Sequence, residues 1–152
     1  MNVVVSTNDF KDNQVVEALL DGIEQPIEAI YGDGAYDAQN VYDACDRREA
    51  QAVIPPRESS KIKQHGNSSE QPYQRDENIR EIRKKGKAGW KLDNHYHQRS
   101  LSETVMFRFK SAFGVLLKSR KFENQAKEAF LKCKILNIFA QIGLANSQPA
   151  LV

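Results

Sequence analysis

Four polar side chains, Tyr96, Arg99, Glu103 and Lys110, are spaced so that a single helix would present all of them on one narrow stripe. With a step of about 100° per residue they fall within about 60° of one another, and the stripe is about 21 Å long. A phenol, a guanidinium, a carboxylate and an ammonium suit an extended ligand that carries phosphates, with the carboxylate available to a cation.

Two simpler interpretations of this stripe stay open. It is also what the solvated face of an amphipathic helix would show, because apolar residues fall on nearly the opposite side and are expected to be buried. These residues are Leu101, Val105, Phe109, Ala112, Phe113 and Leu116. In addition, Ser100 and Glu103 match the capping-box pattern, so Glu103 could serve only to cap a helix that begins at Ser100.

A second acidic candidate, Asp33, lies in "YGDGAYD", Tyr31 to Asp37, directly after a run that predicts a strand. An Asp-Gly pair after a strand is commonly a turn. Small neighbours also let a ligand approach the backbone closely, which suits Asp33 as a metal ligand. The sequence by itself leaves both interpretations open.

The elements that would position these residues alternate along the first third of the chain. Strands are expected at residues 2–6, from after Pro26 to Tyr31, and at residues 51–54. Helices are expected between them, the first with Thr7, Asn8 or Asp9 as its cap. This alternation predicts an α/β sheet with crossover helices.

The rest of the chain predicts mainly helix. Residues 57–75 are polar and predict an exposed loop. A basic helix follows, interrupted by Gly86 and Gly89, and then two long helices from about 93 to 118 and from about 122 to 144. One domain over residues 1–152 is expected, in the cytoplasm, since there is no apolar run of membrane-spanning length and no signal peptide at the start.

Charge is divided unevenly along the chain. Residues 1–58 hold 4 basic and 12 acidic side chains, whereas residues 75–121 hold 13 basic and 5 acidic ones. This division suits a protein that holds metal ions in one part and a polyanion in another, although two solvated faces would explain it equally well. Cys45 and Cys133 have no second ligand at metal-binding spacing, so buried thiols are expected.

Two of these stretches carry a resemblance to a known family. "YGDGAYD" resembles the segment around the second catalytic aspartate of DDE-class transposases of bacterial insertion sequences, the IS-five family. Tyr96, Arg99, Glu103 and Lys110 match its signature of Tyr, two residues, Arg, three residues, Glu, six residues, Lys at every spacing. "AVIPPR", Ala52 to Arg57, and "GWK" also resemble family segments, so the resemblance extends over nearly the whole chain.

The resemblance implies a ribonuclease-H-like fold and metal-dependent cleavage and transfer of DNA strands. Two Mg²⁺ ions held by Asp, Asp and Glu would assist the attacking oxygen and the leaving oxygen. Asp33 and Glu103 would be the catalytic carboxylates and metal ligands. Arg99 and Lys110 would hold phosphates, and Tyr96 would stack on a base or bond a phosphate. DNA, as element ends and target, is the implied partner.

The chain also departs from the family pattern. The family's first aspartate lies on a strand for which this chain has no clear counterpart, and Asp9, the only acid near residues 2–6, is better explained as a helix cap. We therefore expect the C-terminal portion of the catalytic domain, truncated at its N-terminus and inactive alone. An upstream transposase segment would complete it, and an exposed sheet edge would favour self-association.

Two alternatives remain beside this hypothesis. The first is a non-catalytic nucleic-acid-binding remnant that contacts phosphates through basic side chains. Those side chains are Arg80, Arg83, Lys84, Lys85, Lys87 and Lys91, of which Lys91, Arg83, Lys84 and Lys85 would also serve the transposase as DNA contacts. The second is a ribonuclease-H-like nuclease of another kind.

Overall fold

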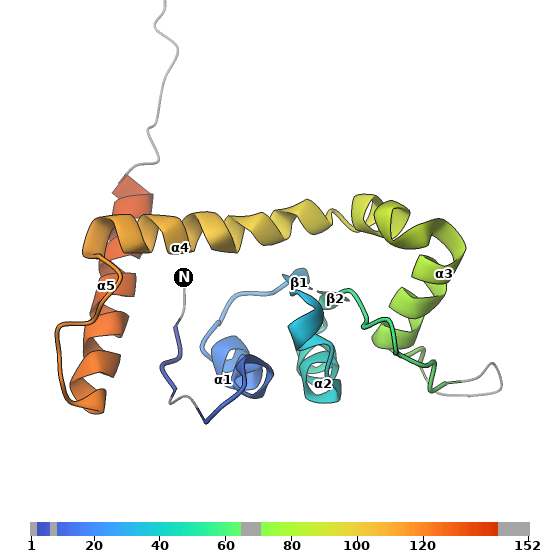
Figure 1. Ribbon diagram of the computed structural model, residues 1–152, viewed down its shortest axis with the longest axis horizontal. Helices are drawn as coiled ribbons and strands as arrows, with labels where there is room; N and C mark the ends of the chain where they lie inside the picture. The colour runs from blue at the N-terminus through green and yellow to red at the C-terminus, as the bar shows by residue number, and fades with distance from the viewer. Residues whose placement is uncertain (1–2, 7–8, 65–70, 143–152) are drawn as a thin grey trace, which may run out of the picture. The chain divides into compact units, whose positions relative to one another are not determined.

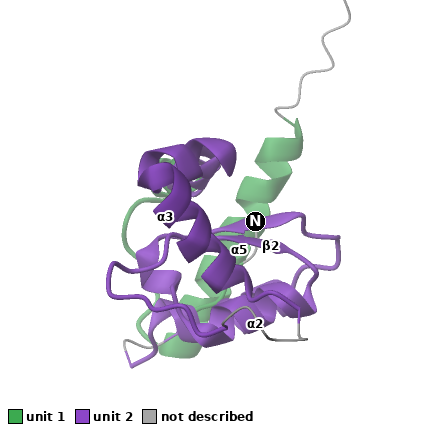
Figure 2. Ribbon diagram, turned by 90° about the vertical axis from the view of Figure 1, so that its right-hand side faces the viewer, with its two compact units in different colours: residues 1–5, 104–152 green, residues 6–103 purple. Residues whose placement is uncertain are grey.

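The computed structural model describes residues 3–6, 9–64 and 71–142 (Figure 1). The chain divides into two compact units, coloured separately in Figure 2. We call residues 6–103 the strand-bearing unit, and residues 1–5 with 104–152 the helical unit. Among the helices of the described ranges, none has the length and apolar character that crossing a bilayer requires.

A small parallel sheet lies at the centre of the strand-bearing unit. Strands β1 (Ala29–Tyr31) and β2 (Gln51–Val53) pair in parallel, with Ile30 opposite Ala52. Helix α2 (Gln39–Arg47) connects them, so the expected strand, crossover helix and strand are confirmed. The fold is mixed α/β, with more residues in helices than in strands.

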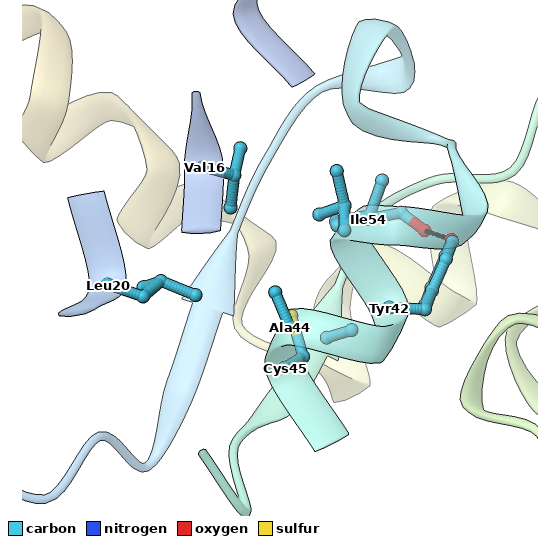
Figure 3. Packing of buried hydrophobic residues seen from close by; sticks show 8 residues of the cluster. Val16, Leu20, Tyr42, Ala44, Cys45 and Ile54 are labelled. Carbon is cyan, nitrogen blue, oxygen red and sulfur yellow. Dashed lines mark hydrogen bonds between the residues drawn. The ribbon is translucent and has the colours of Figure 1, made fainter. Parts of the chain in front are cut away.

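Helices α1 (Val16–Asp21) and α2 supply most of the hydrophobic core, and Figure 3 shows how its side chains pack. Val16 and Leu20 from α1 share one buried cluster with Tyr42 from α2 and with Ile54, which follows β2. The Tyr42 hydroxyl is satisfied inside the core, because it donates to Asp37 Oδ1 at 3.3 Å, with the Ile54 carbonyl at 3.5 Å as a weaker alternative acceptor. Burial of this cluster is the main force that holds β1, β2 and the two helices together.

The start of the chain differs from the sequence prediction. Residues 3–6 form no strand, because the described sheet is made of β1 and β2. The first helix is also shorter than expected: a 3₁₀ turn, η1 (Asp12–Gln14), precedes α1, whose N-cap is Val15. Asp9 is therefore not a helix cap, and Thr7 and Asn8 lie outside the described residues.

Helix α3 (Gln74–Asp93) closes the outer edge of β2 with side chains. The Ala52 N–H donates to Gln74 Oε1 at 2.6 Å, and the Ala52 carbonyl accepts from Asn78 Nδ2 at 2.9 Å. The buried Trp90 indole in turn donates to Asn78 Oδ1 at 3.2 Å. Because both backbone groups of Ala52 are satisfied by amides, this edge of the sheet needs no further strand.

Helix α3 is kinked at Gly86, which has φ 75° and ψ 160°. This backbone conformation is almost restricted to glycine, so the predicted interruption at Gly86 is confirmed. The interruption predicted at Gly89 is wrong, because Gly89 keeps helical geometry and the helix continues to Asp93.

The long helix predicted from about 93 to 118 is shorter. His95, in the left-handed region at φ 50°, leads into a 3₁₀ turn, η3 (Tyr96–Arg99), and only then does α4 (Ser100–Phe113) begin. Helix α4 ends where Gly114 adopts φ 78°. The loop expected at 57–75 is confirmed up to Tyr73 within its described residues, because α3 begins at Gln74.

The prediction that one side of α4 is buried is wrong. None of its residues is buried, and Leu101 keeps 62% of its surface exposed. Leu116 lies beyond the helix and is 77% exposed. A helical wheel shows which residues share a face, but it cannot show whether another element covers that face.

Helix α5 (Phe122–Ile142) completes the helical unit and agrees with the predicted helix over its described residues; Leu144 lies outside them. The connection from α4 is held by Glu128, whose carboxylate accepts from the N–H groups of Lys118 and Ser119 at 2.9 to 3.0 Å. The Lys132 ammonium, 2.8 Å away, together with these backbone donors lowers the pKa of Glu128 to about 2.

Both cysteines are buried free thiols, as predicted. Burial raises the pKa of Cys45 to about 12 and also raises that of Cys133.

The kink at Gly86 gives a first prediction. A Gly86→Ala substitution should lower the free energy of unfolding by about 1 to 3 kcal/mol, because alanine is strained at this φ and ψ. Urea unfolding followed by circular dichroism measures this. Lys87→Ala, an exposed change one residue later, should shift the free energy by less than about 0.5 kcal/mol. Equal effects of the two substitutions would show that the kink does not depend on glycine.

Candidate functional site

Asp33 lies two residues after β1, at the carboxyl end of the strand. Its Oδ1 accepts the Ala35 N–H at 2.8 Å, so it caps the 3₁₀ turn η2 (Gly34–Tyr36). The turn interpretation of the Asp-Gly pair is therefore confirmed. The structure gives its second oxygen, Oδ2, no hydrogen bond within the described part of the chain, so that oxygen can accept a further ligand.

A cavity of about 330 Å³ opens beside Asp33. Most of its wall is apolar and comes from α1, β1 and α2, and its polar lining includes Asp33, Arg99 and Ser102. The fold brings these residues together because η3, which contains Arg99, contacts β1. Residues 66 positions apart in sequence thus share one cavity.

Glu103 reaches this site through Arg99. Arg99 Nη2 donates to Glu103 Oε1 at 2.6 Å, an (i, i+4) pair across the start of α4. The Glu103 side chain is 63% exposed and does not line the cavity. The hydrogen bond and charge of Glu103 raise the pKa of Arg99, and the Asp33 carboxylate contributes in the same direction. The Arg99 guanidinium is therefore stabilised by the negative charge of both predicted metal ligands, Glu103 and Asp33.

Tyr96 lies in the same electrostatic environment. Burial raises the pKa of its phenol; Arg99 acts against this shift and Asp33 adds to it. Its ring centroid is 5.8 Å from that of the buried Trp90, and Lys91 Nζ lies 5.2 Å from the ring centroid. The indole thus fixes the phenol ring, and the ammonium covers it as a cation–π partner. Lys110, on the part of α4 in the helical unit, stays a prediction.

The basic side chains of α3 differ in their availability. Arg80 pairs with Glu77 and also donates to the Gln64 carbonyl at 2.5 Å, and Lys85 pairs with Asp93 at 2.7 Å. Arg83 and Lys84 are exposed and form no ion pair within the described ranges. Of these four, Arg83 and Lys84 are therefore the cations free to meet phosphates.

Sequence reasoning missed Asp37, whose side chain is fully buried. Its carboxylate accepts from Arg75 Nε at 2.7 Å, from the Arg57 N–H at 2.9 Å and from Ser60 Oγ at 2.9 Å, and the Tyr42 hydroxyl donates at 3.3 Å. Burial on its own would raise the pKa of Asp37, but the donors, led by Arg75, outweigh it and hold the pKa below its usual value. The donors are up to 38 residues away, so no local spacing could have indicated this role.

The Asp37 cluster also steadies the turn that carries Asp33. Arg57, held through its N–H by Asp37, donates from Nε to the Gly34 carbonyl at 3.2 Å. The Gly32 N–H continues the ladder by donating to the Val53 carbonyl at 3.3 Å. The backbone on both sides of Asp33 is therefore anchored, one side to the sheet and the other to the loop after β2.

A second buried carboxylate, Asp76 on α3, holds the same loop further along. Its Oδ2 accepts the N–H groups of Lys63 and Gln64 at 2.9 and 2.7 Å. The loop is thus fixed to α3 at Asp76 as well as to Asp37.

Comparison with known protein families adds to this geometry. Residues 1–138 match the family described as "Transposase DDE domain", and the chain belongs to this family. Membership connects it with DNA transposition, with an enzyme activity on DNA, and with a class of enzymes that generally uses divalent metal ions. No solved structure matches the chain.

Asp37 gives a prediction on pH. Because its folded-state pKa lies below the unfolded value of about 3.9, it stabilises the fold above that pH, and the contribution is lost as pH falls through the folded-state pKa. Asp37→Asn should lower the free energy of unfolding at pH 7 by about 3 kcal/mol, because Arg75 would keep a buried charge without a partner. It should also flatten the dependence on pH below about 4.

The measurement is urea unfolding between pH 3 and 7. Asp43→Asn is a suitable control, since it changes a nearby aspartate, on α2, whose carboxylate accepts from Tyr73 and Gln39 rather than from an arginine. If Asp37→Asn kept the full acid dependence of the natural protein, the buried ion pair would not be its source.

Proposed function

We propose that this chain is the catalytic portion of a DDE transposase of the IS-five family of bacterial insertion sequences, with a ribonuclease-H-like fold. The observation that carries the proposal is the cavity shared by Asp33 and Arg99, with Glu103 bound to the same arginine. Arg99 thus links the two acids, which are 70 residues apart in sequence: it lines the cavity of Asp33 and forms an ion pair with Glu103.

The residues present fit a hard divalent cation. Asp33 has an oxygen with no hydrogen bond from the described residues, and Glu103 has an exposed carboxylate, both of the oxygen type that Mg²⁺ prefers. Mg²⁺ bound there would assist attack by water or a 3′-hydroxyl and offset charge on the scissile phosphate. We propose Asp33 and Glu103 as catalytic metal ligands, with Arg99 and Lys110 as phosphate contacts and Tyr96 as a stacking or phosphate contact.

We further propose that the chain does not cleave DNA alone. Within the described ranges no group of three or more histidine, cysteine, aspartate or glutamate side chains is placed to hold a metal ion. Asp33 and Glu103 would then be two ligands of a larger set that a further transposase segment completes.

DNA, as element ends and target, is the proposed substrate, and exposed cations on α3 and beyond would bind its backbone. Arg83, Lys84 and Lys87 form no ion pair among the described residues, and Lys91 lies over the Tyr96 ring. These free charges also support the alternative, a nucleic-acid-binding protein without chemistry.

Self-association and a cytoplasmic, nucleoid-associated location complete the proposal. Large apolar side chains remain exposed on the two helices of the helical unit, a surface that proteins commonly cover by association. They include Phe107, Phe130, Leu131, Phe139 and Ile142.

Substitution of the two proposed ligands tests metal binding. Asp33→Asn and Glu103→Gln should each weaken Mg²⁺ affinity by about tenfold or more, because each removes an anionic oxygen ligand. Isothermal titration calorimetry measures this at constant ionic strength. Glu123→Gln, an exposed acid at the start of α5, is the matched control for loss of one negative charge and should leave the affinity unchanged. Unchanged affinity in both ligand variants would favour the binding-only alternative.

The basic residues of α3 give a separate prediction for DNA. Lys84→Gln should weaken binding of a duplex and reduce the slope of log affinity against log salt by about 1, because one phosphate contact is lost. Lys85→Gln, its neighbour, should have a smaller effect, because Lys85 is already paired with Asp93. Fluorescence anisotropy over a series of salt concentrations measures both. Equal slopes for the natural chain and Lys84→Gln would exclude Lys84 from the interface.

A further inference from the structure

Arg99 occupies an unusual position for a residue assigned to phosphate. Its guanidinium is bonded to Glu103 at 2.6 Å and lies in the field of Asp33, whose cavity it lines. The two carboxylates that raise the pKa of Arg99 are therefore the two proposed metal ligands. A side chain in this place balances the same negative charge that a divalent ion would balance.

This balance cannot persist once a metal ion is present. Two carboxylates and one guanidinium carry a net charge of −1, and a divalent ion added among them brings the total to +1 with two cations close together. Repulsion between the metal and the guanidinium would then favour release of Arg99. The release is inexpensive, because the Glu103 side chain is 63% exposed and exposed ion pairs contribute little to stability.

We propose that Arg99 is an internal counter-cation that exchanges between two partners: it neutralises Asp33 and Glu103 when no metal is bound, and it turns to a DNA phosphate when a divalent ion takes its place. The inference rests on the proposed metal-binding role of Asp33 and Glu103. It adds a coupling between the binding of metal and the binding of DNA, since metal binding would free Arg99 to bind a phosphate. By linkage, phosphate binding would then strengthen metal binding by the same factor.

The position of Arg99 favours such an exchange. It is the last residue of η3, directly before α4, so its side chain can turn without moving the buried elements. The neighbouring Tyr96 is held by Trp90 and carries Lys91 over its ring, so a second cation remains beside Tyr96 in either state. A guanidinium also suits both partners, because its planar fork bonds carboxylates and phosphates alike.

The first test measures Mg²⁺ affinity by calorimetry in the natural chain and in Arg99→Gln. Removal of the competing cation should tighten Mg²⁺ binding roughly three- to tenfold. Lys91→Gln removes a positive charge from the same neighbourhood without touching either carboxylate, so it measures the general effect of charge and should change the affinity less. Affinity in Arg99→Gln that equals or falls below that of the natural chain would overturn the exchange.

The second test measures binding of a short single-stranded oligonucleotide with and without Mg²⁺ at constant ionic strength. In the natural chain Mg²⁺ should raise the affinity, because it frees Arg99, and in Arg99→Gln this gain should disappear. Ordinary screening by Mg²⁺ acts in the opposite direction, since it weakens contacts to phosphates. A gain of the same size in Arg99→Gln would refute the exchange.

The two hypotheses can fail separately. If Asp33→Asn and Glu103→Gln leave Mg²⁺ affinity unchanged, the proposed metal site itself is wrong and the exchange falls with it. If those substitutions weaken Mg²⁺ binding but Arg99→Gln does not strengthen it, the metal site stands and the exchange is wrong. Circular dichroism and urea unfolding of Arg99→Gln show whether the variant is folded like the natural chain.

Discussion

The Asp37 carboxylate is fully buried, and three separate parts of the chain supply the donors that keep it charged. Tyr42 comes from α2, Arg57 and Ser60 from the loop after β2, and Arg75 from the first turn of α3. A buried charge without these donors would be very unfavourable, so each segment must reach its place for the others to be stable. The cluster therefore couples the crossover helix, the loop and α3 into one unit.

This constraint reaches the proposed site through backbone contacts. The loop held by Asp37 in turn holds the Gly34 carbonyl, next to Asp33, and η3 brings Arg99 to the same cavity from the other end of α3. The two acids are thus placed by different means, one by a strand end and one by a helix start. Arg99 pairs with Glu103 and lines the same cavity as Asp33, so one guanidinium offsets negative charge from both acids.

Sequence patterns predicted what depends on local chemistry. β1 and β2 were found from their apolar runs and flanking prolines, and the kink in α3 from Gly86. The strand expected at residues 2–6 was wrong over its described residues, 3–6, because a β-branched run favours a strand but does not by itself place the run in a sheet. The prediction that one face of α4 is buried was wrong, because amphipathic spacing shows which residues share a face but does not ensure that another element covers it.

The candidate site was predictable in part for the same reason. Spacing predicted Tyr96, Arg99 and Glu103 on one helix; the structure divides them between η3 and α4 but confirms that Arg99 and Glu103 meet. Asp37 and Asp76 were missed because their partners come from the loop and helix that follow, at separations of up to 38 residues. Hydrogen bonds between residues so far apart follow no regular spacing, so a single sequence does not reveal them.

The two thiols have a practical consequence. Cys45 and Cys133 are the only cysteines of the chain, both are buried, and burial raises the pKa of each, so little reactive thiolate exists at neutral pH. A cysteine introduced on the surface would therefore react with maleimide reagents much faster than either natural one. Fluorescent or spin labels can thus be attached at single chosen positions without first replacing the native residues.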